Sequence, residues 1–396
     1  MALSIDAAKW RGRRGMERLL DALAADEGAT RYVGGAIRDD LLDLPVSDVD
    51  LATRFEPEEV IRRLEAARIK AVPTGIDHGT VTAVSDGHPY EVTTLRRDIE
   101  TFGRHATVAF TTDWEEDAAR RDFTINALSA DPATGEVFDY FGGLDDLLER
   151  HVRFIGDPLK RIAEDHLRIL RYFRFHARFG AGEPDLAALD ACTARANDLM
   201  ALSRERIADE LLKLLELPDP TTTVEIMIGR NILKPVIPEM TTAGLSALKS
   251  LIPTEEVAKI APDGLRRLVA LLPRDAAIAQ DVAARLKLSN KSRKRLACAA
   301  VADMTLPPEA LAYRVGNGCA VDRLLLAGKP AEAKRIAKWH SPRLPIGGGL
   351  LIERGLIEGP IVARTLRKIE DRWVTEGFPQ GKAFEQIVAD ALAEAR

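Results

Sequence analysis

The 396-residue sequence predicts an α+β fold, with an N-terminal head on a small mixed sheet and an elongated all-helical region after it. Strand-like runs mix with short helical patterns up to about residue 150, and helical patterns broken by Pro or Gly follow from residue 159 onward. Aromatic residues make up only 5% of the chain, whereas Ala, Leu and Arg are plentiful, which favours helices over a β-sandwich.

The head elements follow from local patterns of apolar and polar residues. Alternation predicts the strands 31–33, 47–53, 80–84, 90–95 and 137–140. A period near 3.6 predicts the helices 13–25, 36–43 and 57–68, the last of which is opened by Pro57. Strands and helices interleaved in this way indicate an α+β domain around a small sheet.

The helical region shows no convincing strand pattern. Its predicted helices are 159–179, 185–200, 204–217, 222–231, 243–251, 255–260, 263–272, 277–286, 291–303, 307–315, 319–327, 331–339, 347–354, 358–374 and 380–394. The predicted domains are a head at 1–150, a neck at 151–217, a body at 218–330 and a tail at 331–396.

Composition restricts the class of protein. The N-terminal residues lack the apolar run of a secretory signal, and no stretch approaches the roughly 18 apolar residues of a membrane span. Cys192, Cys298 and Cys319 are far apart and form no Cys-x-x-Cys pair, so we expect neither a disulfide framework nor a zinc knuckle. A reducing cytoplasm fits this pattern best. The net charge of −5 does not exclude a nucleic-acid partner, because phosphates respond to local charge.

The segment from Tyr32 to Thr53 carries the clearest chemical pattern. A strand ends in Gly34-Gly35, which lets the backbone approach a ligand closely, and a helix begins directly afterwards. The free N–H groups at such a helix start favour a phosphate. Asp48 and Asp50 then stand two residues apart, and on a strand two such side chains project from the same face.

Two carboxylates this close repel each other unless a cation lies between them. Oxygen ligands shared with substrate phosphates suit Mg²⁺, which can activate an attacking hydroxyl and stabilise departing pyrophosphate. The sequence therefore predicts that Asp48 and Asp50 hold Mg²⁺. Glu91 or Asp122 would complete the site, and we prefer Glu91 because it lies on a predicted sheet strand.

Five motifs follow one another between residues 34 and 211. They are Gly34-Gly35-x-x-Arg38-Asp39 with Asp48-x-Asp50; Arg120-Arg121-Asp122-Phe123-Thr124-x-Asn126-Ala127; Asp139-x3-Gly143-x2-Asp146; Glu164-Asp165-x-x-Arg168; and Arg204-Glu205-Arg206-Ile207-x-x-Glu210-Leu211. Together they resemble the class II tRNA nucleotidyltransferase (CCA-adding enzyme) and bacterial poly(A) polymerase family, within the DNA polymerase beta-like superfamily. The resemblance implies a nucleotidyltransferase head and template-independent addition of CCA to the 3′ end of tRNA from CTP and ATP.

The resemblance also assigns expected roles to residues of this chain. It implies catalysis by Asp48 and Asp50, and the predicted strand position adds Glu91 to the expected catalytic residues. Nucleotide and triphosphate binding falls on Gly34, Gly35, Arg38, Arg121, Asp122 and Asn126, and coupling of head and neck falls on Asp139, Gly143 and Asp146. Recognition of the base falls on Glu164, Asp165 and Arg168.

The last of these roles also has a physical basis. In a continuous helix Asp165 and Arg168 share a face, so a carboxylate acceptor stands beside a guanidinium donor. Such a pair can read the edge of a nucleobase without a nucleic-acid template, and Glu164 would hold the arginine in place. Out of context, the three residues would be an ordinary ion pair on a solvated helix.

Basic residues gather in the body. Between residues 285 and 295 no acidic residue interrupts them, and the expected RNA contacts are Lys287, Lys291, Arg293, Lys294 and Arg295. A tRNA acceptor arm recognised through its backbone and shape is the expected partner, and no obligate protein partner is evident. The alternative for the cluster is a solvated helix face.

Three alternatives for the function stay open at this level. The first is a poly(A) polymerase, although the near-neutral C-terminus lacks the strongly basic tail that these enzymes tend to carry. The second is a relative that adds only CC or only A, which would differ mainly in the expected loop around residues 96–115. The third is an RNA-binding module with a dead catalytic site, which the retained motif residues oppose.

Overall fold

The computed structural model describes residues 4–102 and 105–395. The chain divides into two compact units, Met1–Leu202 with Arg230–Pro235, and Ser203–Gly229 with Val236–Arg396. The described residues of the first unit form a mixed sheet with helices, and those of the second form helices alone. The α+β prediction is confirmed, while the finer division into head, neck, body and tail stays a prediction.

A seven-stranded sheet is the centre of the first unit, in the order β3-β4-β5-β2-β1-β8-β9. Its strands are β1 Thr30–Val33, β2 Asp50–Thr53, β3 Lys70–Gly75, β4 Thr80–Ser85, β5 His88–Thr94, β8 Ser129–Ala130 and β9 Val137–Phe138. The β2–β5 pair is parallel and the other neighbours are antiparallel. The predicted strand 47–53 is shorter than expected, because pairing with β1 starts only at Asp50.

The expected loop around residues 96–115 is largely an antiparallel hairpin of β6 Arg96–Phe102 and β7 His105–Phe110. Helix α5 follows at Trp114–Ala119. Residues 103 and 104 lie outside the described residues.

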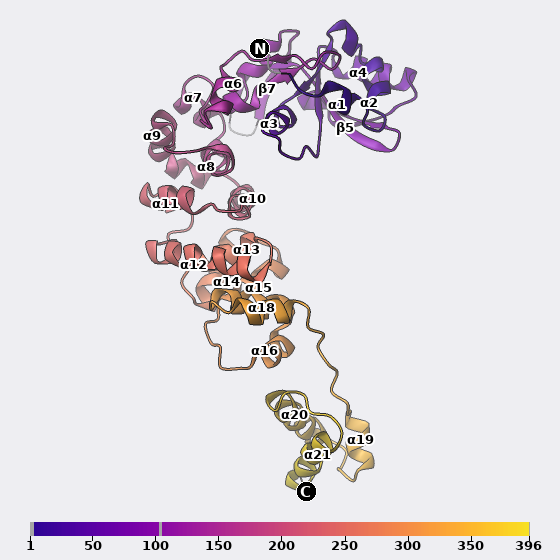
Figure 1. Ribbon diagram of the computed structural model, residues 1–396, viewed down its shortest axis with the longest axis vertical. Coiled ribbons are helices and arrows are strands. Elements are labelled where there is room, and N and C mark those ends of the chain that lie inside the picture. Colours follow the sequence, from indigo (N-terminus) through magenta and orange to yellow (C-terminus); the bar gives the residue numbers. More distant parts are fainter. Residues whose placement is uncertain (1–3, 103–104, 396) are drawn as a thin grey trace. The chain divides into compact units, whose positions relative to one another are not determined.

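Helices α1 Ala7–Arg11, α2 Met16–Ala22 and α4 Pro57–Ala66 pack beside one another and against β3 and β4 in the indigo part of Figure 1. Trp10 and Leu64 are buried on these helices, and the Trp10 ring contacts that of Tyr32 on β1. Helix α3 spans Gly35–Leu41 and α6 spans Gly143–Leu148. The sheet is thus covered by short helices whose apolar side chains form the core of the head.

The expected helix 159–179 is in fact two helices, α7 Pro158–Glu164 and α8 Arg168–Phe179. Asp157 caps the start of α7, with its carboxylate accepting from the Leu159 and Lys160 amides. The break falls at Asp165, whose backbone is extended at φ −149° and ψ 108°. The apolar stripe of α8 is buried at Ile169, Leu170 and Phe173, as expected for core. Helix α9 follows at Leu186–Ala194.

The helices of the second unit succeed one another as predicted, with one exception. They are α10 Arg204–Leu215, α11 Thr221–Gly229, α12 Thr242–Ala258, α13 Gly264–Leu271, α14 Ala276–Arg285, α15 Asn290–Ala300, α16 Pro308–Val315, α17 Asn317–Leu326, α18 Pro330–Ala337, α19 Gly348–Glu353, α20 Pro360–Thr375 and α21 Lys382–Ala395. The exception is α12, which continues through Pro253 where we expected two helices. Buried Leu251 and Ile252 on one side of the proline and Ala258 on the other keep the helix packed despite the missing N–H.

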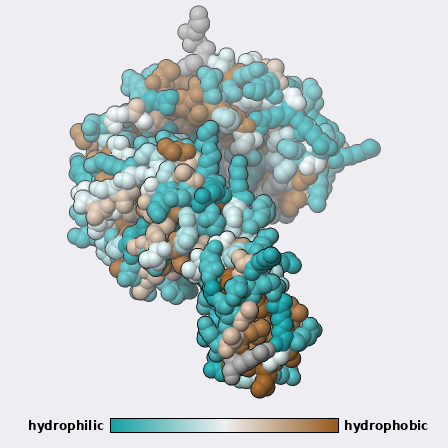
Figure 2. Space-filling view, turned by 60° about the horizontal axis from the view of Figure 1, so that its bottom comes forward, coloured by the Kyte–Doolittle hydropathy of each residue, from teal (hydrophilic) through white to brown (hydrophobic). Residues whose placement is uncertain are grey.

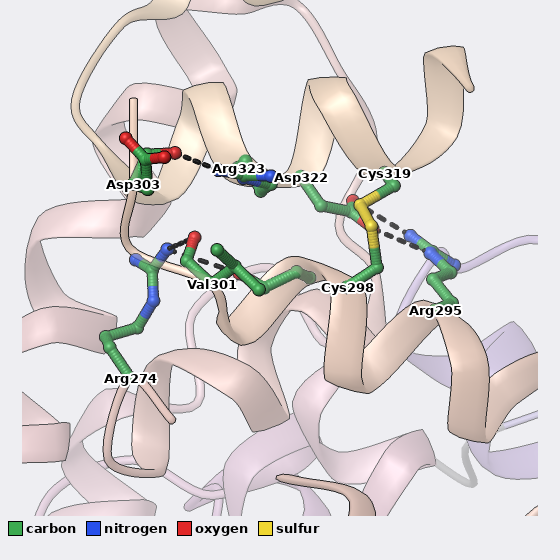
Figure 3. The surroundings of a disulfide bond; sticks show 9 residues. Arg274, Arg295, Cys298, Val301, Asp303, Cys319, Asp322 and Arg323 are labelled. Atoms are coloured by element: carbon green, nitrogen blue, oxygen red, sulfur yellow. Dashed lines mark hydrogen bonds and ion pairs between the residues drawn. A yellow bond between two sulfur atoms is a disulfide. The ribbon is translucent and has the colours of Figure 1, made fainter. Parts of the chain in front are cut away.

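The expectation of no disulfide is wrong for one cysteine pair. Cys298 on α15 and Cys319 on α17 form a disulfide with their Cα atoms 6.2 Å apart. Figure 3 shows this bond beside the ion pair of Arg295 with Asp322. The two cysteines are 21 residues apart in sequence, and only the packing of α15 on α17 brings them together. Cys192 is free and buried.

The face drawn in Figure 2 is mostly hydrophilic, with hydrophobic residues in small groups. In the part of the chain that is described, no helix combines the length and the apolar composition needed to cross a membrane.

Candidate active site

Asp50 and Glu91 lie next to each other because their strands are parallel neighbours. Leu51 on β2 is paired with Val92 on β5, which places the two preceding residues, both acidic, side by side. Asp48 precedes β2 in a segment without regular structure, and its carboxylate accepts a 3.0 Å hydrogen bond from the Ser47 hydroxyl. The two aspartates are therefore not on one strand face as predicted.

The three carboxylates nevertheless share one pocket of about 560 Å³. Its lining residues are Arg13, Ser47, Asp48, Val49, Asp50, Thr82, His88, Pro89, Tyr90 and Glu91. Among the described residues Glu91, and not Asp122, belongs to this lining. The preference for Glu91 as the third carboxylate thus agrees with where its side chain lies.

The electrostatics of the pocket favour a cation. Desolvation by the surrounding protein raises the pKa of Asp50, and the charges of Glu91 and Asp48 raise it further, while Arg121 opposes the shift. Asp50 is an exposed residue, so its carboxylate lies in an open hollow and not in the core. Like charges held together in this way are relieved by a bound cation.

A complete protein cage for a metal is not preformed. Within residues 4–102 and 105–395 no three carboxylate, imidazole or thiol groups are close enough to hold an ion by themselves. Two carboxylates with open positions match Mg²⁺, which keeps water and substrate phosphate oxygens among its ligands. The donor set of the pocket therefore fits Mg²⁺ bound together with a nucleotide.

The glycine turn brings Arg121 toward these carboxylates. Gly34 lies between β1 and α3 with φ at +77°, a conformation that side chains disfavour. A Cβ at this position would stand 3.2 Å from an Arg121 guanidinium nitrogen, so the arginine lies across the turn. Asp117 on α5 holds the other terminal nitrogen of Arg121 at 3.1 Å. Helix α3 has only seven residues, and Arg121 beside the turn stays the predicted phosphate ligand.

Three of the residues predicted to bind nucleotide, Arg38, Asp122 and Asn126, are joined by hydrogen bonds, and their nucleotide-binding role stays a prediction. Asp122 accepts hydrogen bonds from Arg171 at 2.7 Å and from the Asn126 amide at 3.0 Å, and Arg38 donates to the Asn126 side-chain oxygen. Burial alone would raise the pKa of Asp122, but the Arg171 charge and these hydrogen bonds lower it. Arg38 is buried and lies 4.0 Å from the centre of the Phe179 ring. These contacts link the segment after Arg121 to α3 and α8.

The predicted base-reading residues meet across the break between α7 and α8. Glu164 forms ion pairs with Arg168 and, at 3.0 Å, with Arg161. Arg168 also donates to the Arg120 carbonyl at 3.2 Å, so it touches the chain directly before Arg121. The prediction that Asp165 and Arg168 share a face of one helix is wrong. Asp165 is extended, and its carboxylate accepts from the Leu167 amide at 3.1 Å.

The residues expected to couple head and neck build the start of α6. Asp139 accepts from the amides of Gly143 and Leu144, both at 2.9 Å. A Cβ at Gly143 would stand 2.3 Å from the Thr124 carbonyl, so only glycine fits this contact. Buried Asp146 accepts from the Thr124 hydroxyl and from Arg153 at 2.7 Å. The motif therefore fixes α6 against the segment that carries Asp122.

The basic residues predicted to contact RNA differ in their solvent exposure and in their ion pairs within the protein. Lys291 and Lys294 on α15 are exposed, and Arg293 is half-buried. Exposed Lys287 pairs with Glu205 at 3.3 Å. Arg295 is half-buried and forms ion pairs with buried Asp322 at 2.7 Å and with Asp263 at 2.9 Å. Of the predicted RNA contacts, Arg295 is thus the one most occupied by ion pairs within the protein, and its contact with RNA stays a prediction.

Sequence reasoning missed three arginines of the site. Arg13 lines the carboxylate pocket, Arg161 shares Glu164 with Arg168, and Arg171 holds Asp122. Arg161 stands three residues before Glu164, a helical spacing that signals an ion pair. Nothing in the local sequence around Arg13 or Arg171 indicates their partners, which are distant in the chain.

Comparison with known proteins places these features in context. Residues 30–153 match the family model described as the poly A polymerase head domain, and residues 184–243 match that of the probable RNA- and SrmB-binding site of polymerase A. The mitochondrial CCA tRNA nucleotidyltransferase 1 of Mus musculus is 33% identical over 389 residues, which cover 93% of this chain and 88% of that protein. A CCA-adding enzyme of Lacticaseibacillus paracasei is 32% identical over 367 residues, covering 88% of each chain.

Solved structures give the same result for the fold. The Bacillus stearothermophilus CCA-adding enzyme in complex with CTP is similar with a TM-score of 0.74 and 25% identity, covering 96% of this chain and 98% of that one.

Proposed function

Because this chain belongs to the family of CCA tRNA nucleotidyltransferases, we propose that it adds C, C and A in turn to the 3′ end of tRNA, using CTP and ATP and no nucleic-acid template. The observation that carries the proposal is the convergence of Asp48, Asp50 and Glu91 in one pocket, with Arg121 close enough to influence Asp50. Phosphoryl transfer needs this combination of carboxylates for a cation and a guanidinium for phosphate.

The reaction forms a bond between the terminal 3′-oxygen of the RNA and the α-phosphorus of the nucleotide. The bond from that phosphorus to the oxygen bridging to the β-phosphate breaks, and pyrophosphate leaves. Asp48 and Asp50 would hold Mg²⁺, which would supply charge neutralisation and lower the pKa of the attacking hydroxyl. The hydroxyl proton passes to the carboxylate cluster, to which Glu91 adds its charge, and from there to water.

Phosphate binding is assigned to Arg121 beside the Gly34-Gly35 turn. The forked guanidinium can donate two parallel hydrogen bonds to phosphate oxygens. Its second partner, Asp117, keeps it oriented when no nucleotide is bound. Hydrogen bonds among the buried residues Arg38, Asp122 and Asn126 hold the segment that carries Arg121 in place.

Base selection is assigned to Asp165 and Arg168, with Glu164 holding the arginine. Arg168 donates a hydrogen bond to the Arg120 carbonyl, so the proposed base-reading arginine contacts the residue directly before Arg121, the proposed phosphate ligand. This contact would hold the base-reading side chain at a constant distance from the side chain that binds the triphosphate. The coupling motif around Gly143 would transmit movement of the head to this turn.

The RNA-contact surface is assigned to Lys287, Lys291, Arg293 and Lys294. Exposed amines on α15 can neutralise backbone phosphates of an acceptor arm. We expect the enzyme to work in the cytoplasm without an obligate protein partner.

Omission of single nucleotides tests this function. Purified protein is incubated with Mg²⁺, a tRNA that lacks its CCA end, and CTP, ATP or both. We expect two C residues with CTP alone, and the complete CCA with both nucleotides. ATP added to RNA without prior CTP would instead identify a poly(A) polymerase, CC alone would identify a partial adder, and no incorporation would indicate an RNA-binding module.

A further inference from the structure

We propose that Arg13 is a positioning residue for the divalent-cation site, because it holds the backbone that presents Asp48. The inference rests on the proposed function of Asp48 and Asp50. Arg13 lies in the turn between α1 and α2, 35 positions before Asp48 in the sequence (48 − 13 = 35). None of the five motifs contains it.

The contacts of Arg13 fall directly before the metal aspartate. One terminal nitrogen of its guanidinium donates to the Ser47 carbonyl at 2.9 Å, and the other donates to the Val46 carbonyl at 2.8 Å. Arg13 and Asp48 also line the same pocket. A movement of these two carbonyls would carry the Asp48 carboxylate with it.

The Asp48 segment lacks the support that Asp50 has. Asp50 is the first residue of β2 and is paired with Val33 across the antiparallel ladder. Residues 44–49 form neither helix nor strand, so Asp48 is not fixed by a ladder. A two-carboxylate site binds a cation well only when both groups are held in place, and Arg13 supplies a hold on the less regular one.

The turn that carries Arg13 is itself anchored to the sheet. The Tyr90 hydroxyl donates to the Arg14 carbonyl at 2.8 Å, and Tyr90 directly precedes Glu91 on β5. Gly15 has φ at +74°, and a Cβ there would stand 2.7 Å from the Ser85 carbonyl, so the turn is pressed against the end of β4. Arg13 thus ties the segment of Asp48 to the strand of Glu91.

A direct role of Arg13 in binding triphosphate is the competing explanation. Both terminal nitrogens already donate to backbone carbonyls, which favours the positioning role. The two explanations differ in a measurable way. A positioning residue affects cation binding in the absence of nucleotide, whereas a phosphate ligand affects only the KM for CTP.

Arg18 provides a matched control on the same pair of helices. Its guanidinium donates to the Arg68 carbonyl at 2.9 Å and to Asp86 at 3.2 Å. It is therefore another arginine that binds a distant carbonyl, and the pocket lining does not include it. Arg18→Ala removes a similar set of contacts without touching the Asp48 segment.

The test compares wild type, Arg13→Ala, Arg13→Lys and Arg18→Ala. Mn²⁺ binding to nucleotide-free protein is followed by electron paramagnetic resonance of the free ion, and the Mg²⁺ concentration for half-maximal CCA addition and the KM for CTP are measured alongside. We expect Arg13→Ala to weaken Mn²⁺ binding about tenfold or more, by analogy with loss of groups that orient metal ligands. Arg13→Lys should fall between Arg13→Ala and wild type, and Arg18→Ala should match wild type.

Thermal midpoints identify variants that fold. If Arg13→Ala does not fold, Arg13→Lys decides the matter, since one amine cannot donate well to both carbonyls and should bind Mn²⁺ more weakly than wild type. Unchanged Mn²⁺ binding in the folded variant, an equal loss in Arg18→Ala, or a rise in the KM for CTP alone would overturn the inference. Failure of wild type to add CCA would overturn the proposed function instead, and the Mn²⁺ measurement would still be readable.

Discussion

Glu91 lies beside Asp50 on the neighbouring parallel strand, and the charge of Glu91 helps to raise the pKa of Asp50. The sheet itself produces this relationship, because the pairing of Leu51 with Val92 sets the register of β2 against β5. The strand pair therefore holds the negative charges of Asp50 and Glu91 close together, and both charges attract a cation bound beside them.

The raised pKa of Asp50 predicts that cation binding is sensitive to acid. A carboxylate must lose its proton to bind a metal, so Mn²⁺ affinity should fall as pH drops through the raised pKa. Because burial and repulsion raise this pKa, the fall should begin at a higher pH than for an ordinary aspartate. In Glu91→Gln one repelling charge is gone, so the midpoint of the fall should move to lower pH. Titrating Mn²⁺ into both proteins across pH checks this, and an unmoved midpoint would contradict the coupling.

The raised pKa of Asp50 also determines how the stability of the metal-free protein changes with pH. The folded-state pKa of Asp50 lies above its unfolded value, so its contribution is fully present below the unfolded pKa and is lost as pH rises through the folded one. Glu91→Gln should therefore reduce the loss of stability over that rise.

Asp50→Ala should abolish nucleotide addition while tRNA binding survives, since only the cation site is removed. The loss of rate should be about 10³-fold or more, because metal stabilisation of the developing charge is worth several kcal/mol. Incorporation of labelled CTP and a filter-binding titration with tRNA give the two readouts. Asp209→Ala, which removes an exposed carboxylate paired with Lys213, is the control and should match wild type. Turnover near the wild-type rate in Asp50→Ala would refute the metal assignment.

Arg168→Ala should damage the choice of nucleotide more than the binding of triphosphate. A lost hydrogen-bonding pair at a base edge corresponds to about 1–3 kcal/mol, or about 5- to 160-fold in discrimination. Single-turnover addition of each of the four nucleotides measures it. Arg178→Ala on the same helix, where the arginine is partly exposed and pairs with Asp39 at 3.3 Å, should leave the selectivity unchanged. An equal loss for all four nucleotides after Arg168→Ala would rule out base reading.

Asp122→Ala should destabilise the protein strongly, since it leaves Arg171 and Asn126 without their shared acceptor. Breaking a buried ion pair from one side removes roughly 3–5 kcal/mol of stability. Urea unfolding of the variant should show a loss in this range. Because the folded pKa of Asp122 is lowered, its contribution is present above the unfolded pKa and disappears as pH falls through the folded one. A near-neutral effect on unfolding would show that the network is not structural.

Because Cys298 and Cys319 form a disulfide, the oxidised protein should contain one free thiol, that of Cys192. In oxidised protein, alkylation under denaturing conditions without reductant should modify only Cys192, and after reduction it should modify all three cysteines. Closing a loop of about this length stabilises by roughly 3 kcal/mol in the chain-entropy treatment. Reduction should therefore lower the thermal midpoint. Three free thiols in the oxidised sample would refute the bond.

The motifs and the order of elements were predictable because they are local. The strand at Val33, the glycine turn at Gly34 and the cap at Asp157 depend on residues within a few positions of one another. The three carboxylates of the pocket were named from the sequence, but the predicted reason was partly wrong. Asp48 precedes β2, and the register of β2 against β5 brings Glu91 beside Asp50.

The corrections concern contacts that sequence does not display. Asp165 ends α7 and binds the Leu167 amide, because a short acidic side chain competes with the helix for backbone hydrogen bonds. Nothing before folding indicates that Asp122 meets Arg171, that Arg295 meets Asp322, or that Cys298 meets Cys319. Each of these pairs is formed only when distant helices or loops pack together.

The most direct test of the account is a crystal structure of the protein with CTP and Mg²⁺. We predict an ion bound by oxygens of Asp48 and Asp50 at about 2.0–2.1 Å, with the remaining positions taken by water and by phosphate oxygens of CTP. Aspartate side chains turned away from the nucleotide, with no ion between them and the triphosphate, would contradict the central claim.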